Sequence, residues 1–245
     1  MEFAAELGAD IIRCGGEVSR AEDSVARICI ALGAERAEVF GINSYISVCV
    51  KDYEGETHTV SRRIRGRGTD LGRLEQLNRL SRHICEGKIG IEDAVKRFNE
   101  RDGESPAWLT YLASTLVCSV FTLYFGGTLV EAIAAGIAAT VTVWLKRKAG
   151  SGFGNAVVFT FICSVLCGSA GALLTLIGFA ADYSMIAKGD IMLLVPGVSI
   201  VCAGRDIICG ELLTGLLGFI ETILIALALA VGFALPELFV SLIKG

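Results

Sequence analysis

The pattern of hydrophobic positions changes near residue 106. Before that point, apolar residues recur at helical or strand spacing among many charged residues, whereas after it they form long, nearly unbroken runs. Periodic apolar positions are typical of half-buried elements, and long apolar runs are typical of membrane spans. The pattern therefore predicts a small α+β domain over residues 1–106, followed by an α-helical multi-pass membrane domain over residues 107–245.

Helical periodicity is visible at four places in the first domain. Apolar residues at four-residue spacing predict a helix over residues 2–13. Ser19 and Glu22 have the spacing of a capping box, so a second helix is expected to begin there. Two further amphipathic helices are expected, one after Asp70 and one over residues 91–98.

Strand periodicity lies between these helices. Residues 46–50 alternate between apolar and small polar side chains, and residues 57–64 can return as a paired strand after a turn at residues 52–55. A short strand is also expected over residues 38–40. These features predict a hairpin with about four helices around it.

Five spans are predicted in the membrane domain, and the fourth is interrupted. Proline removes a backbone donor, so Pro196 and Gly197 should break this helix near its middle. A membrane tolerates such open backbone only where it is buried in protein or lines a wet cavity. The predicted spans are residues 108–125, 128–145, 155–179, 190–207 and 212–235.

Ionisable residues beside the break define the candidate site. A short, interrupted apolar segment followed by charges indicates a transporter's binding site, because intramembrane charge is costly. We therefore expect substrate binding by Pro196, Gly197, Arg205 and Asp206, and proton coupling by Glu221 or Glu131. The alternative is a kinked packing helix, with Arg205 and Asp206 paired at the membrane surface, Glu221 only packing, and Glu131 reaching the outer surface.

Charge supports this division of the chain and predicts an orientation. Residues 1–106 hold 16 of the 22 Lys and Arg residues and 19 of the 26 Asp and Glu residues, without a basic block that would suggest nucleic acid. The N-terminus lacks the features of a signal peptide, and Lys146–Lys148 follow the second span. The protein is thus expected in the cell membrane, with its first domain in the cytoplasm and Gly245 outside.

Enzyme chemistry is not indicated by the residue pattern. The nine cysteines form no metal-binding spacing, no nucleophile is placed near a base, and no glycine-rich phosphate loop is present. We expect no catalytic residue, no metal and no cofactor.

The chain resembles the threonine/serine exporter family. The similarity covers nearly the whole sequence and is carried by Gly16–Glu22, Thr57–Thr59, Arg62, Phe125–Gly127, Val195–Gly197, Arg205, Asp206 and Gly210. Full-length members of that family carry about ten spans, and split members divide them between two chains. The resemblance therefore implies a second small membrane subunit, an oligomer, and a substrate that is a small polar amino acid or a dicarboxylate.

These observations lead to one main functional hypothesis and three alternatives. The main hypothesis is a subunit of a secondary exporter of threonine or serine, driven by the proton gradient. A dicarboxylate (succinate) exporter subunit is the first alternative, and a membrane-anchored ligand sensor is the second. A membrane-tethered hydrolase is disfavoured because no catalytic pairing is found.

Overall fold

The computed structural model describes residues 1–66, 68–100, 106–149 and 155–244, which form two compact units. The first unit comprises Met1–Gly103 and Val198–Phe219, and the second comprises Glu104–Gly197 and Ile220–Gly245. Residues 198–219, which the sequence pattern assigned to the membrane domain, thus pack with the N-terminal residues. Gly245, predicted to face outside, lies beyond the described residues.

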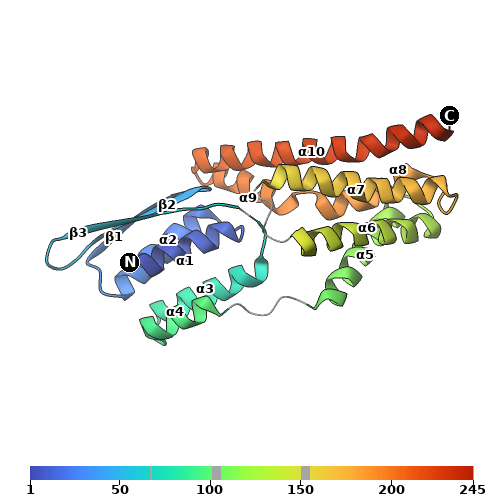
Figure 1. Ribbon diagram of the computed structural model, residues 1–245. Helices are drawn as coiled ribbons and strands as arrows, with labels where there is room; N and C mark the ends of the chain where they lie inside the picture. The colour runs from blue at the N-terminus through green and yellow to red at the C-terminus, as the bar shows by residue number, and fades with distance from the viewer. Residues whose placement is uncertain (67, 101–105, 150–154, 245) are drawn as a thin grey trace. The chain divides into compact units, whose positions relative to one another are not determined.

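The N-terminal part of the first unit is a three-stranded antiparallel sheet with four helices (Figure 1). The strands pair in the order β1-β2-β3, and Val48 of the central strand faces Val39 and Val60. Leu7, Ile28 and Leu77 are buried in the common core. The elements are α1 (Glu2–Arg13), α2 (Val18–Ala31), β1 (Arg36–Ile42), β2 (Tyr45–Lys51), β3 (Thr57–Arg63), α3 (Leu71–Cys85) and α4 (Ile91–Asn99).

The predicted capping box at Ser19 and Glu22 is wrong. Helix α2 begins at Val18, with Glu17 as its N-cap residue, so Ser19 already lies inside the first turn. Val18 is fully buried, and this burial extends the helix past the expected start. The Glu22 carboxylate instead accepts a hydrogen bond from the Gly41 amide of β1 at 2.6 Å, which ties α2 to the sheet.

A buried ion pair connects three helices of this part. The Arg73 Nε atom of α3 donates to the Asp10 carboxylate of α1 at 3.0 Å, and both side chains are almost inaccessible. Arg73 also donates to the Phe98 carbonyl at 2.7 Å, and its guanidinium lies over the Phe98 ring. Arg13 supplies a second cation to Asp10 at 2.8 Å. Burial of the charges is tolerated because the polar atoms have partners.

Six helices follow, and four of them are long and apolar enough to cross a membrane, or five spans if α8 and α9 count as one broken span. The predicted fourth span begins earlier than expected, because its helix starts at Tyr183, and the last helix continues past residue 235. These helices are α5 (Ala107–Tyr124), α6 (Leu129–Ala149), α7 (Ala156–Leu176), α8 (Tyr183–Leu194), α9 (Gly197–Ile208) and α10 (Leu212–Lys244).

Small residues let the helices of the second unit approach closely. A Cβ atom on Gly136 of α6 would lie 2.7 Å from the Thr115 side chain of α5. A Cβ atom on Gly168 of α7 would lie 2.8 Å from the Tyr183 hydroxyl of α8. Such distances leave no room for a larger side chain, so these glycines fix the spacing of the bundle.

Candidate functional site

The helix break falls at Val195 and Pro196, between α8 and α9. Proline lacks the amide that would bond to the Met192 carbonyl one turn earlier. The Gly197 amide bonds to the Val195 carbonyl at 2.8 Å instead of continuing the helical ladder. The last turn of α8 is therefore incompletely bonded, and α9 begins with the free amides that every helix start exposes.

Arg205 is held by the N-terminal part of its own unit. Its Nη1 atom donates to the Glu17 carboxylate at 2.6 Å, and the Arg205 side chain is 59% exposed whereas that of Glu17 is 14% exposed. In the same unit, the Asn43 side-chain amide of the β1–β2 turn donates to the Thr214 carbonyl of α10 at 3.4 Å. Two contacts thus join the α9–α10 segment to the first domain.

Glu131 caps the start of α6. Its carboxylate accepts hydrogen bonds from the Thr128 amide at 2.7 Å and the Thr128 hydroxyl at 3.0 Å, so a capping box lies at the start of α6. The other carboxylate oxygen accepts from the Asp182 amide at 3.2 Å, just before α8. Glu131 is buried and used structurally at the junction of two helices.

Asp206 and Glu221 do not share a unit. Asp206 is 5% exposed and belongs to the first unit with Arg205, whereas Glu221 is half-buried and belongs to the second unit. Pro196 and Gly197 also belong to the second unit. The structure therefore brings Arg205 to Glu17, and it divides the predicted site residues between two units.

Asp190 is the acidic residue that the sequence analysis did not select. It lies in α8, one turn before the break, and is 1% exposed. Neither carboxylate oxygen has a hydrogen-bond partner among the described residues, and the hydroxyl of Thr142 is likewise buried and unpaired. The thiols of Cys118 from α5 and Cys167 from α7 lie beside the carboxyl group. A helical stripe of buried residues on α8, at positions 183, 186, 190 and 194, could have revealed it.

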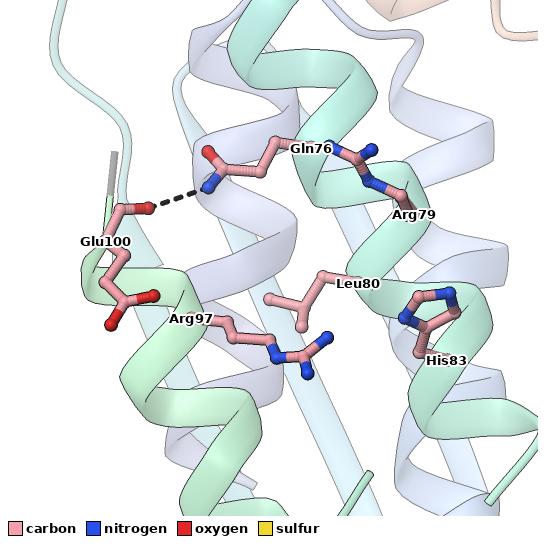
Figure 2. A pocket seen from close by; sticks show the side chains of 6 residues that line it. All are labelled: Gln76, Arg79, Leu80, His83, Arg97 and Glu100. Carbon is pink, nitrogen blue, oxygen red and sulfur yellow. Dashed lines mark hydrogen bonds between the residues drawn. The ribbon is translucent and has the colours of Figure 1, made fainter. Parts of the chain in front are cut away.

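A pocket of about 340 Å³ lies between α3 and α4 of the first unit (Figure 2). The Gln76 side-chain amide donates to the Glu100 carbonyl at its edge, at 2.7 Å. Two arginines and a histidine give the pocket a basic lining, which suits a small anion. The lining residues are Gln76, Arg79, Leu80, His83, Arg97 and Glu100.

The described ranges contain histidine, cysteine and acidic residues, the side chains that commonly bind metal ions. There, no group of three or more His, Cys, Asp or Glu residues is arranged to hold a metal ion. All nine cysteines are free. In the first domain, burial is the main cause that raises the pKa of the Cys14 thiol to about 11, so this cysteine is an unreactive packing residue at neutral pH.

Several apolar helices, close glycine contacts and an interrupted helix pair define a multi-pass membrane protein. The model of the family described as "Putative threonine/serine exporter" (ThrE) matches residues 2–237, and the chain belongs to this family of transporters. No solved structure matches the chain.

Three named relatives are similar to the chain at low identity. A "Probable succinate transporter subunit YjjP" of Klebsiella aerogenes is 24% identical, covering 91% of this chain and 86% of the relative. The protein of the same name from Escherichia coli K12 is 24% identical over 93% of this chain and 89% of the relative. A "Probable threonine/serine exporter" of Mycobacterium tuberculosis is 23% identical over 71% of this chain, but the match spans only 33% of that longer protein.

Proposed function

We propose that this chain is one subunit of a secondary exporter of small polar metabolites, with threonine and serine as substrates and the proton gradient as driving force. The observation that carries the proposal is the interrupted α8–α9 pair with the buried, unpartnered Asp190 one turn before the break. Open backbone inside a membrane is tolerated only where it is buried in protein or lines a wet cavity, and a buried acid without a partner is typical of a transport pathway. Membership of an exporter family supports the same class of function.

Substrate binding is proposed at the break itself. The amides that open α9 at Gly197 form the N-terminal end of that helix, where the helix dipole favours anions, and both named substrate classes carry a carboxylate. Arg205 and Asp206 are further sequence-based candidates for substrate binding, and Glu221 is the sequence-based candidate for proton coupling. Dicarboxylate export is the alternative, because two of the relatives are named as succinate transporter subunits.

The substrate is tested by efflux from loaded membrane vesicles. Vesicles containing this chain and a co-expressed partner subunit are loaded with labelled threonine, serine or succinate, and efflux is followed with and without a pH gradient. Faster efflux of threonine and serine is expected. Preferential efflux of succinate supports the alternative, and no gradient-dependent efflux of any of the three contradicts the proposed function.

A second membrane subunit is proposed because the two relatives that match over most of their length are named as subunits. Affinity purification of the tagged chain from its native membrane is expected to recover a smaller membrane protein. Full export by this chain alone, reconstituted into liposomes, would contradict the need for a partner.

The proposed location is the cell membrane, with the first domain and Lys148 on the cytoplasmic side and the α7–α8 connection outside. Ala181 is exposed in that connection, so Ala181→Cys in a cysteine-depleted protein should react with an impermeant thiol reagent in whole cells. Lys148→Cys should stay protected. The reverse labelling pattern would invert the orientation.

Ligand sensing by the first domain is a second candidate function, favoured by the basic pocket between α3 and α4. It predicts that threonine, serine or succinate protects the α3–α4 amides of the full chain from hydrogen exchange. Arg97→Gln should remove that protection. Unchanged exchange at saturating concentrations of all three ligands would exclude this candidate.

A further inference from the structure

We propose that Asp190 is the carboxyl group that takes up and releases a proton during transport. The purpose of this step rests on the proposed export function, but the proton site itself rests on the geometry around Asp190. Glu131, a sequence-based candidate for proton coupling, provides a comparison.

The first argument is that the Asp190 carboxyl group has no conventional partner. The residue is 1% exposed, and in the part of the chain that the structure describes neither oxygen has a hydrogen-bond partner. The groups beside it are the thiols of Cys118 and Cys167, which are weak donors. An ionised carboxylate in such surroundings carries a large desolvation cost, which favours the neutral, protonated acid.

The second argument concerns the groups that face Asp190 from each neighbouring helix. Cys118 comes from α5 and Cys167 from α7, Tyr183 lies on α8 itself, and Thr142 of α6 lies beside Cys167. The Tyr183 hydroxyl is engaged elsewhere, because it donates to the Phe233 carbonyl at 3.0 Å. None of these groups carries a positive charge. The cation that acts on this cluster is Lys146 of α6, whose charge acts on the Cys118 thiol, whereas among the described residues no cation acts on Asp190 itself.

The third argument is space. A Cβ atom on the adjacent Gly189 would lie 2.7 Å from the Cys118 carbonyl and would collide with the Thr122 hydroxyl group. Helices α5 and α8 therefore touch through their backbones beside Asp190. A metal ion or an ammonium group would have to separate these helices, whereas a proton binds to a carboxyl oxygen without needing a cavity.

Release of the proton requires that water reach the Asp190 carboxyl group. The incompletely bonded turn at residues 191–195 provides a route for it. This turn lies between Asp190 and Pro196, and it lacks the hydrogen bond that the proline amide would have donated. Turns with missing backbone bonds open at low free-energy cost. Opening of this turn admits water to Asp190, and closing it returns the carboxyl group to its buried, protonated state.

The transport test compares Asp190→Asn with a control on the same helix, Asp182→Asn. Asparagine keeps the shape of the buried acid but cannot release a proton, and at residue 182 it still serves as an N-cap. In vesicles with the partner subunit, Asp190→Asn is expected to lose at least ten-fold of gradient-driven efflux while keeping substrate exchange. Asp182→Asn and Glu131→Gln should keep both activities. Normal gradient-driven efflux by Asp190→Asn, with unchanged pH dependence, overturns the proposal.

A second measurement does not depend on the substrate. Infrared spectra of the full chain, with the partner where it co-purifies, should contain a protonated-carboxyl band that responds to pH. This band should be absent in Asp190→Asn and present in Asp182→Asn. If wild-type vesicles export none of the three substrates but the band behaves in this way, the export function fails and the proton site stands. A band that persists in Asp190→Asn belongs to another residue and overturns the site.

Asp190→Glu, which keeps an acid at the site, serves as the control in case Asp190→Asn does not fold. If Asp190→Asn is not recovered in folded form, the band in Asp190→Glu must shift relative to wild type. An unshifted band in this variant also overturns the proposal.

Discussion

The Arg205 guanidinium lies 2.6 Å from the Glu17 carboxylate, although 188 positions separate the two residues in the chain. Glu17 is the N-cap residue of α2, and Arg205 lies in the last turn of α9. The sequence pattern favoured a role for Arg205 beside a substrate or beside Asp206. The ion pair shows a different use of its charge, which is to attach α9 to the N-terminal helices of the same unit.

This ion pair predicts that substitutions at the two positions act alike. Glu17→Gln and Arg205→Gln should lower the stability of the purified protein by similar small amounts, with a coupling free energy of about 0.2–1 kcal/mol, because the arginine is largely exposed. A double-mutant cycle on unfolding in detergent measures the coupling, and Arg20→Gln on α2 serves as the control. Loss of export in Arg205→Gln alone, without any coupling to Glu17, would instead assign Arg205 to the substrate.

Glu131 should behave as a capping residue. Glu131→Ala removes the acceptor for the Thr128 and Asp182 amides, so a loss of about 1–2 kcal/mol in stability is expected. Glu131→Gln keeps one acceptor oxygen and should lose about half as much, while proton-driven export continues. Glu237→Gln, on an exposed position of α10, is the charge-matched control. Abolished proton coupling in a folded Glu131→Gln protein would contradict the structural role.

The buried Asp10–Arg73 pair predicts a large local effect in the first domain. Asp10→Asn leaves a buried guanidinium without its carboxylate, although the Phe98 carbonyl remains as an acceptor. A loss of about 3 kcal/mol in the free energy of unfolding is therefore expected. Hydrogen exchange of α1 and α3 amides in the full chain should become about 100-fold faster. Asp23→Asn, which breaks the exposed Asp23–Arg27 pair, should change exchange by less than about three-fold. Equal effects of the two substitutions would show that burial of the first pair has no energetic consequence.

Glu22 predicts how stability depends on pH. Burial is the main cause that raises the pKa of Glu22 above its ordinary value of 4.5; the nearby Glu211 charge raises it further, and the Gly41 amide opposes the shift. The folded protein therefore binds more protons at Glu22 than the unfolded chain does, from about pH 4.5 upward. The contribution of Glu22 to stability is therefore fully present below about pH 4.5, and it is lost as the pH rises through the folded-state pKa.

Glu22→Gln should remove this dependence, because the amide oxygen can still accept the Gly41 hydrogen bond but does not titrate. Unfolding of the full chain between pH 4 and pH 8 measures the slope, and Glu92→Gln on the exposed face of α4 is the control. An identical slope in wild type and Glu22→Gln would contradict the prediction.

Much of the secondary structure follows from local periodicity. The helix predicted over residues 2–13 coincides with α1, and the alternation at residues 46–50 lies within β2, because each pattern reports one buried face. The Ser19–Glu22 prediction failed because a capping box depends on where the helix begins, and burial of Val18 moved that point. A motif of four residues does not contain the tertiary contacts that decide where a helix begins.

The candidate site was less predictable, because it depends on pairing between distant residues. Arg205 and Glu17 are too far apart in sequence for any spacing rule to connect them. Asp190 was predicted as the first residue of the broken span, and the candidates in that span were the residues from Pro196 onward. The stripe that includes Asp190 begins at Tyr183, in a turn of α8 that the predicted span left out.

Helix α10 has a consequence for the lipid environment. It contains 33 residues, which at about 1.5 Å per residue gives a length of about 50 Å, against about 30 Å of bilayer hydrocarbon. The apolar stretch of the helix covers almost this whole length, from Leu212 to Ile243. Such a mismatch is relieved by tilt, by local thickening of the bilayer, or by cover from protein at one end. The first turns of α10 belong to the unit that contains the N-terminal residues, so protein cover is available there. Bilayer thickness thus becomes a physical variable acting on this protein, and acyl-chain length a means of controlling it.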